Sequence, residues 1–444
     1  MVSKLQNIIG SQKFYSFSGS IITAGFSLIS FSLLARGLSI REFGLWTFFL
    51  TIYSFSELVM NGLVGLPLVK MGSEGGVKYQ GSLISGALKI CLWAILGISV
   101  LVGLVFWIVW LISGDDFYIQ IIYWFTICSL VSIPMSFAVW TNSIRIKFQK
   151  VTIVTGSMKF LFMCGSIIVY IYDLDLEYVL ALFALSISST SLISLLLGWT
   201  NLKGALSGTK RYARKILDFG KFSVGTLLGS SALSSSDTMI IMAFLGPEAV
   251  ALYNVPMRII GLYDIPLRSL GQIAFPTLSR VKSKLGIKGF VKEFETSNGF
   301  TFLILFPLSL MIFIFAETLV EVIGGQGYSE ATALLRIFSL YLFITPLDRF
   351  GGIALDALNR PHLNFRKMMI MLLANILGDF AAIYLEGGVT YVALASISTF
   401  ALGTFISYYY LRHEVPFRFF TLLVAGNREL FRLFSKIGLV KARN

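Results

Sequence analysis

Apolar stretches of about twenty residues or more recur along the whole 444-residue chain, with only short polar breaks between them. A helix needs about 20 apolar residues to cross the hydrocarbon of a bilayer. A membrane β-barrel would need segments of roughly 10 residues with alternating polarity, whereas these stretches are continuously apolar. Only 13% of the residues are charged, against about a quarter in soluble proteins. The sequence therefore predicts an all-α integral membrane protein with no room for a soluble domain.

The polar breaks divide the chain into about twelve predicted spans, six on each side of a basic connector. The spans lie near residues 14–36, 43–69, 82–112, 117–142, 151–172, 177–200, 218–245, 250–278, 296–323, 331–358, 365–385 and 389–411. We therefore predict four parts: an N-terminal lobe at 1–200, the connector at 201–217, a C-terminal lobe at 218–412 and a basic tail at 413–444. The first span is too long for a signal-peptide core and lacks an evident cleavage site, so we expect it to stay attached.

Basic residues concentrate in alternate loops. If the N-terminus is inside, the inside stretches hold most of the 36 lysines and arginines, including Arg360, Arg366 and Lys367 after span ten, while the outside loops are mainly acidic. Short loops rich in Lys and Arg stay cytoplasmic. We expect both termini in the cytoplasm, and topology then explains the net charge of +13 without a nucleic-acid partner.

The tail after Pro416 is predicted to form an amphipathic helix on the anionic cytoplasmic leaflet. One stripe carries Arg428, Arg432 and Lys436, and the other carries Leu430, Phe431, Phe434 and Ile437.

An internal repeat is found when span two is aligned with span eight at a shift of 207 residues. Leu45, Trp46 and Glu57 then align with Leu252, Tyr253 and Asp264. Because each half has an even number of spans, both halves enter the membrane in the same sense, as in transporters with repeats related by an axis along the membrane normal. This pattern predicts two six-helix lobes around a central cavity.

Ionisable side chains inside the spans are the best candidates for a site, because each costs about 2.5 to 3.5 kcal/mol on insertion scales and usually faces a cavity or a partner. The acidic candidates, for cation coupling or for lining a cavity, are Glu57, Asp237, Asp264, Asp348 and Asp379. The basic candidates, for substrate binding, are Arg36, Arg258, Arg268 and Arg349.

The arginines differ in their expected surroundings. Arg258 has no acidic residue three or four positions away, so its counter-charge must come from elsewhere, and we rank it first as a substrate contact. Asp264 and Arg268 are four residues apart and can pair along one helix face, which leaves a structural pair and a substrate site as open alternatives. Arg36 lies against the charge trend at an outer span end and is a candidate for an anion-attracting mouth, whereas Arg41 is expected to snorkel to the interface.

Several classes of chemistry lack their signatures. The three cysteines form no CxxC arrangement and the two histidines lie in basic polar stretches, which leaves no cluster with metal-ligand spacing, so we predict no metal site. No Walker A sequence occurs, which argues against ATP hydrolysis by this chain. The internal loops are at most about 15 residues long, too short for the catalytic loop expected of a membrane glycosyltransferase. We therefore predict no catalytic residues and no cofactor.

Three segments resemble Wzx-type O-antigen and polysaccharide flippases, which share a superfamily with MATE drug exporters and lipid II flippases. They are LLARGLSIREFGLW at 33–46, FGKFSVGTLLGSSALSSSDTMIIMAFLGPEAVALYNVPMRI at 219–259 and IAFPTLSR at 273–280. The resemblance implies a transporter in the bacterial cytoplasmic (inner) membrane. Its cargo would be an undecaprenyl-diphosphate-linked oligosaccharide, such as an O-antigen repeat unit of lipopolysaccharide, moved to the outer leaflet by alternating access. The implied partners are this lipid-linked oligosaccharide, membrane lipids, and a glycan polymerase with its chain-length machinery.

The resemblance also bears on individual residues. Lipid II flippases have cavity arginines in their first, second and eighth spans, and Arg36 and Arg258 lie near two of these places, while span two has no match. MATE antiporters often carry an acidic cation site in the first span, and residues 14–36 contain no Asp or Glu. Coupling to a proton or sodium gradient stays open. The alternatives are a cation-coupled exporter of small compounds and a membrane enzyme of glycan assembly.

Overall fold

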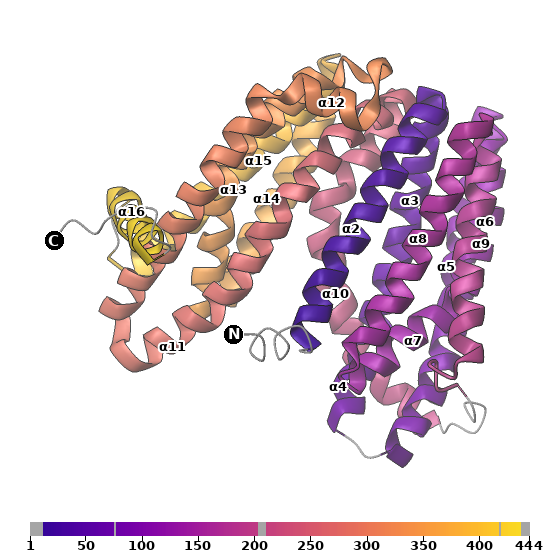
Figure 1. Cartoon of the computed structure of the whole chain (residues 1–444), viewed down its shortest axis with the longest axis horizontal. Coiled ribbons are helices and arrows are strands. Elements are labelled where there is room, and N and C mark those ends of the chain that lie inside the picture. The colour runs from indigo at the N-terminus through magenta and orange to yellow at the C-terminus, as the bar shows by residue number, and fades with distance from the viewer. Residues whose placement is uncertain (1–11, 75–76, 203–209, 417–418, 437–444) are drawn as a thin grey trace. The chain divides into compact units, whose positions relative to one another are not determined.

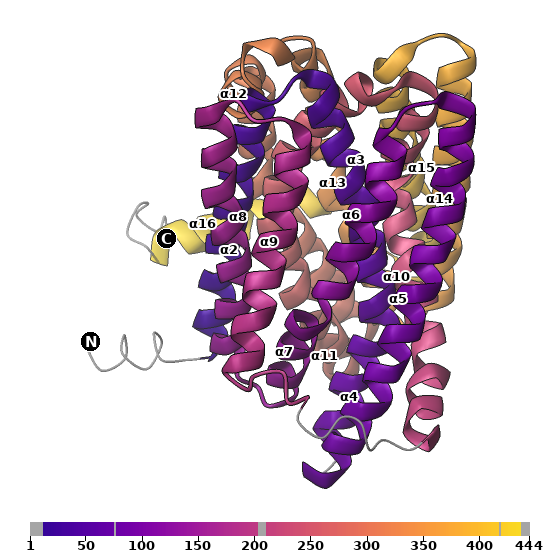
Figure 2. The same cartoon turned by 90° about the vertical axis from the view of Figure 1, so that its right-hand side faces the viewer.

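The computed structural model describes residues 12–74, 77–202, 210–416 and 419–436, and these residues form helices joined by short turns (Figures 1 and 2). The chain divides into two compact units, Met1–Ser231 and Ala232–Asn444. The division falls within helix α10 (Lys210–Leu245). Residues 203–209 of the predicted 201–217 connector lie outside the described residues, and its last part, from Lys210, is already helical.

The first unit contains α2 to α9 and the beginning of α10. The helices are α2 (Gln12–Gly37), α3 (Ile40–Met60), η1 (Asn61–Gly65), α4 (Leu66–Glu74), α5 (Val77–Ser113), α6 (Phe117–Val131), α7 (Ile133–Ile144), α8 (Phe148–Tyr172) and α9 (Leu176–Leu196). Ser39 and Glu42 start α3 with a reciprocal capping box, which satisfies two backbone N–H groups at the helix end. The η1 segment is a π-helical turn that joins α3 to α4; such turns are frequent at functional sites.

The second unit contains the rest of α10 and α11 to α16. The helices are α11 (Pro247–Ile314), α12 (Ala316–Gly324), η3 (Gln326–Tyr328), α13 (Ala331–Ala357), α14 (Pro361–Tyr384), α15 (Gly388–Glu414) and α16 (Phe419–Lys436). The 68 residues of α11 make a hairpin, as Figure 1 shows, because Gly286 leaves the helical conformation with φ 66° and ψ −162°. A positive φ of this kind favours glycine.

The helices agree with the predicted spans. Nine of the described helical segments are long and apolar enough to cross a membrane, and the bent α10 makes a tenth. The hairpin at Gly286 splits α11 into limbs that match spans eight and nine, and α2 corresponds to the first span. The large apolar side chains Trp93, Leu111 and Ile112 on α5 are mostly exposed, as expected where lipid is the solvent. The predicted all-α, multi-pass membrane protein is confirmed.

Helix α16 packs closely against the second limb of α11. A Cβ atom added at Gly299 would overlap the carbonyl oxygen of Leu422, and one added at Gly426 would overlap the backbone of Gly299. Leu422 is buried in a core cluster with Leu278, Phe294 and other residues of this unit. Phe431, which we placed on the apolar stripe, is 56% exposed. The face of α16 that packs against α11 is therefore made by Leu422 and Gly426. The two backbones come into contact there because glycine has no side chain to separate them.

Replacing Gly299 with alanine should destabilise the second unit, because the added methyl group has no room against α16. We expect a loss of about 1–3 kcal/mol, the usual cost of overpacking. Gly261→Ala on the same helix is the matched control, since nothing lies within 4 Å of a Cβ at that position. Thermal unfolding of the detergent-purified variants measures the difference; equal melting temperatures would mean that α16 does not pack at Gly299.

Candidate functional site: a buried carboxylate pair and a separate polar cavity

Two aspartates meet inside the second unit through a shared amide. Asp237 on α10 is 5% exposed and Asp379 on α14 is fully buried. Asn375, one helical turn before Asp379, donates its side-chain Nδ2 to Oδ1 of Asp237 at 2.5 Å and to Oδ2 of Asp379 at 3.3 Å. One amide group therefore links the two carboxylates across α10 and α14.

Hydroxyl groups from two further helices complete the network around Asp237. Ser396 on α15 donates its Oγ–H to Oδ2 of Asp237 at 2.9 Å. The hydroxyl of Tyr253, near the start of α11, donates to the same oxygen. Four helices (α10, α11, α14 and α15) thus contribute a side chain to this network, which we call the carboxylate network.

The carboxylate network lacks positive charge. Across the ranges described above, neither Asp237 nor Asp379 forms an ion pair with a lysine or arginine, and Oδ1 of Asp379 is buried without a hydrogen-bond partner. Two carboxylates that share a site away from water repel each other. A proton or a small cation between them would remove this repulsion, and an all-oxygen donor set suits a hard cation. In the described part of the chain, no group of three or more His, Cys, Asp or Glu side chains could hold a metal ion.

Glu57 lies in the first unit, in a different environment. Its Oε1 accepts hydrogen bonds from the hydroxyls of Tyr53, at 3.2 Å, and Ser132, at 3.1 Å. The side chain also lines a cavity of about 510 Å³ formed by α3, η1, α7, α8 and α9. Lys159 lines the same cavity.

The other two acidic candidates are in ion pairs. Arg268 Nη2 lies 3.1 Å from Oδ2 of Asp264, as their spacing on one helix face predicts. Nζ of Lys367 lies 3.0 Å from Oδ1 of Asp348, and the two side chains are only 5% and 16% exposed. Lys367, which we placed in the inside stretch after span ten, is instead buried in the second turn of α14, because that helix begins at Pro361.

The four arginine candidates are divided between the units. Arg36, exposed at the end of α2, belongs to the first unit; Arg258 and Arg268 on α11 and Arg349 on α13 belong to the second. Arg258 is only partly exposed, and it interacts with other groups of the protein. The absence of an acidic neighbour along its own helix therefore does not leave Arg258 unpaired.

Arg41 lies in the first turn of α3. Its Nη2 lies 2.6 Å from Oδ2 of Asp115, so it joins the start of α3 to the turn after α5, and its position at the membrane interface stays a prediction.

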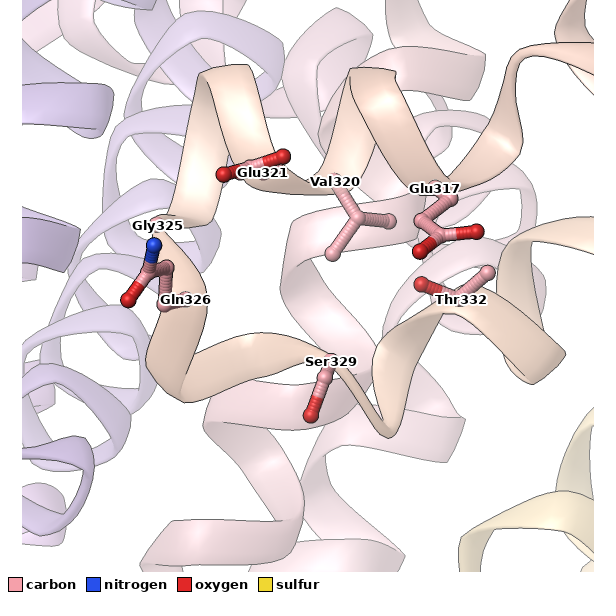
Figure 3. Close-up of a pocket in the computed structure, with 7 residues that line it drawn as sticks. All are labelled: Glu317, Val320, Glu321, Gly325, Gln326, Ser329 and Thr332. Carbon is pink, nitrogen blue, oxygen red and sulfur yellow. The ribbon is translucent and has the colours of Figure 1, made fainter.

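A smaller cavity of about 370 Å³ lies where α12 turns into α13, and Figure 3 shows its side chains around the turn. Glu317 and Glu321 are one helical turn apart on α12, and Gln326, Ser329 and Thr332 complete the polar lining. The cavity is acidic and contains none of the predicted site residues.

The sequence pattern alone missed several partners in these sites. Asn375 carried a usable signal, since it is an amide in an apolar span, four residues before Asp379. Ser396 and Ser132 carried none, because single serines are common in membrane helices. The sequence singled out Tyr253 only as the residue that the internal repeat aligns with Trp46, and not as a site residue. Both side chains are buried.

The comparison with protein families identifies the chain. Residues 33–333 match the family described as polysaccharide biosynthesis protein, which is more than half of the sequence. The chain belongs to the polysaccharide biosynthesis protein family.

Curated relatives agree with this assignment. A protein of Haloferax volcanii, named probable low-salt glycan biosynthesis flippase Agl15, is 25% identical over 207 residues, which are 47% of this chain and 44% of the relative.

A second relative is the teichuronic acid biosynthesis protein TuaB of Bacillus subtilis. It is 22% identical over 207 residues, which are 46% of this chain and 42% of the relative. The chain thus spans less than half the length of the curated relatives that it matches.

Solved structures show the fold of this family member. The lipid II flippase MurJ in an inward closed conformation superposes with a TM-score of 0.75 at 14% identity, over 96% of this chain and 93% of that one. An inward-facing MATE multidrug transporter of the MOP superfamily gives a TM-score of 0.69 at 14% identity, over 92% and 96% of the two chains. The chain therefore has the helical, two-lobe fold of these solved structures.

Proposed function

We propose that this protein is a flippase that moves a lipid-linked oligosaccharide from the cytoplasmic to the outer leaflet of the bacterial inner membrane by alternating access. The family, the flippase name of the relative in Haloferax volcanii and the MOP transporter fold support this proposal. The observation that carries the transport function is the carboxylate network, a buried pair of like charges held between four helices of a transporter fold. Such intramembrane carboxylates are typical of ion-coupled transport paths.

The carboxylate network would couple transport to a proton or sodium gradient. Binding of the cation neutralises the repulsion between Asp237 and Asp379 and favours the packed arrangement of α10, α11, α14 and α15. Release restores the repulsion and favours a looser one. A ligand shifts an equilibrium between two conformations only by its difference in affinity for them, and the carboxylate pair supplies that difference. Asp264 and Asp348, in contrast, already have basic partners.

The membrane orientation belongs to the proposal as well. The basic loops and both termini lie in the cytoplasm, following the positive-inside rule, and the two lobes are residues 1–200 and 218–412. The cargo we favour is an undecaprenyl-diphosphate-linked, O-antigen-like repeat unit, delivered to a glycan polymerase and its chain-length machinery. Transport of extracted glycolipid across proteoliposomes tests the function: its absence in a well-folded preparation contradicts the proposal.

Arg258 is our candidate contact for the cargo diphosphate, because a guanidinium group binds phosphate oxygens through two parallel hydrogen bonds. Replacing Arg258 with alanine should lower flipping by about 10- to 100-fold, the effect of losing a charged hydrogen bond of about 1.5–3 kcal/mol. Arg268→Ala is the matched control on the same helix, since its side chain is 63% exposed and already paired. Equal flipping by both variants in proteoliposomes would remove Arg258 from the cargo site.

A cation-coupled exporter of small compounds is the second candidate, because the carboxylate network would serve either cargo equally well. Overexpression that confers drug resistance, together with an intact surface glycan after deletion of the gene, would favour this alternative. Formation of glycosidic bonds by the purified protein would instead favour an enzyme of glycan assembly.

A further inference from the structure

The cavity beside Glu57 lies wholly within the first unit and is built from four helices and a π-helical turn. Its volume of about 510 Å³ is within the range of about 300–1,000 Å³ typical of small-ligand pockets. Most of its wall is apolar, with a few polar groups placed among the apolar ones. This composition is also typical of a site that binds a specific ligand.

The charges in this cavity balance. Among the described lining residues, Glu57 is the one carboxylate and Lys159 the one ammonium. The described hydrogen bonds to Glu57 from Tyr53 and Ser132 both end on Oε1. None of the described hydrogen bonds ends on the second carboxylate oxygen, Oε2, and the side chain lines the cavity. A neutral pocket of this kind selects neither an anionic diphosphate nor an organic cation.

Aromatic rings and an amide supply the rest of the recognition surface. Trp140 and Phe183 are almost fully buried and form part of the wall. Asn61 lies at the start of the η1 turn, and a Cβ atom added at Gly65 would overlap both the Asn61 amide oxygen and the Trp140 indole. Glycine at position 65 thus lets both side chains approach the helix and line the cavity.

We propose that this cavity binds one or two uncharged pyranose rings of the transported oligosaccharide, an inference that rests on the proposed flippase function. A pyranose presents apolar C–H faces, which match the aromatic rings, and hydroxyl edges, which match a carboxylate, an ammonium and an amide. The cavity would then bind the sugar selectively, while other parts of the protein bind the lipid and the diphosphate.

The test compares two lipids that share one chain and one diphosphate. The first is undecaprenyl diphosphate that carries the oligosaccharide extracted from the source cells, and the second is bare undecaprenyl diphosphate. We measure the Kd of each for the purified full-length chain in nanodiscs. Glu57→Gln and Ser136→Phe, which fills the cavity from α7, should weaken binding of the glycosylated lipid about tenfold and leave the bare lipid unchanged. Glu177→Gln, at an exposed position on α9, is the matched control.

A second readout locates the sugar. Ser54 lines the cavity, so the glycosylated lipid, but not the bare lipid, should slow alkylation of Ser54→Cys by N-ethylmaleimide. Equal Kd values of the wild type for both lipids, or equal effects of the variants on both, would overturn the sugar site and leave the flippase proposal standing. A wild type that binds neither lipid would overturn the flippase proposal itself. If Glu57→Gln does not fold, the Kd values of Ser136→Phe for the two lipids decide the test.

Discussion

Asp237→Asn should lower the apparent affinity for the coupling cation by about 10- to 100-fold and make glycolipid flipping insensitive to an imposed cation gradient. The carboxylate of Asp237 accepts hydrogen bonds from Tyr253, Asn375 and Ser396. An asparagine has the same shape but only one acceptor oxygen, and it turns an N–H group toward one of these donors. Each lost charged hydrogen bond is worth about 1.5–3 kcal/mol, which corresponds to the expected loss of affinity.

The measurement uses proteoliposomes with a proton gradient, a sodium gradient or neither. The wild type should respond to one of the two gradients, and Asp237→Asn to neither. Glu330→Gln is the control in the same unit, because Glu330 is exposed and caps no helix N–H. If Asp237→Asn keeps the gradient response of the wild type, the carboxylate network serves only to hold the four helices together.

Hydropathy was sufficient for the fold because the bilayer imposes one length scale on every span. It predicted two separate helices on the two sides of Gly286, since the basic residues between them mark a turn outside the hydrocarbon. It could not locate α16 against α11, because that contact depends on Gly299 and Gly426 meeting face to face. Glycine in an apolar segment carries no information about its partner.

The candidate sites show the same limit. Asp237 and Asp379 were each predicted as intramembrane acids, but their partnership runs through Asn375, which is 138 residues from Asp237 in the chain. Glu57 was predicted as an intramembrane acid with no partner named, and its partner Ser132 is 75 residues away. Residue type reveals that a charge is costly in the membrane. Only the packing of helices reveals which donor compensates it.

Lys367→Met should destabilise the second unit by about 3–5 kcal/mol, because it leaves the carboxylate of Asp348 buried without its counter-charge. The two groups lie 3.0 Å apart, with side chains 5% and 16% exposed. The matched control is Arg268→Met, which opens the pair with Asp264. Since the Arg268 side chain is 63% exposed, we expect a loss of only about 0–1 kcal/mol there. Thermal or denaturant unfolding of the two purified variants measures the difference.

The double variant Lys367→Met with Asp348→Leu separates a structural role from coupling for this pair. Replacing a buried ion pair by apolar side chains is often neutral or stabilising, so the double variant should recover most of the stability lost in Lys367→Met. If it also flips glycolipid with the gradient response of the wild type, the pair holds α13 to α14 and takes no part in coupling. If stability returns but the gradient response is lost, Asp348 takes part in coupling, as the sequence analysis predicted. If Lys367→Met is as stable as Arg268→Met, a different group compensates Asp348 and the ion pair is not the stabilising contact.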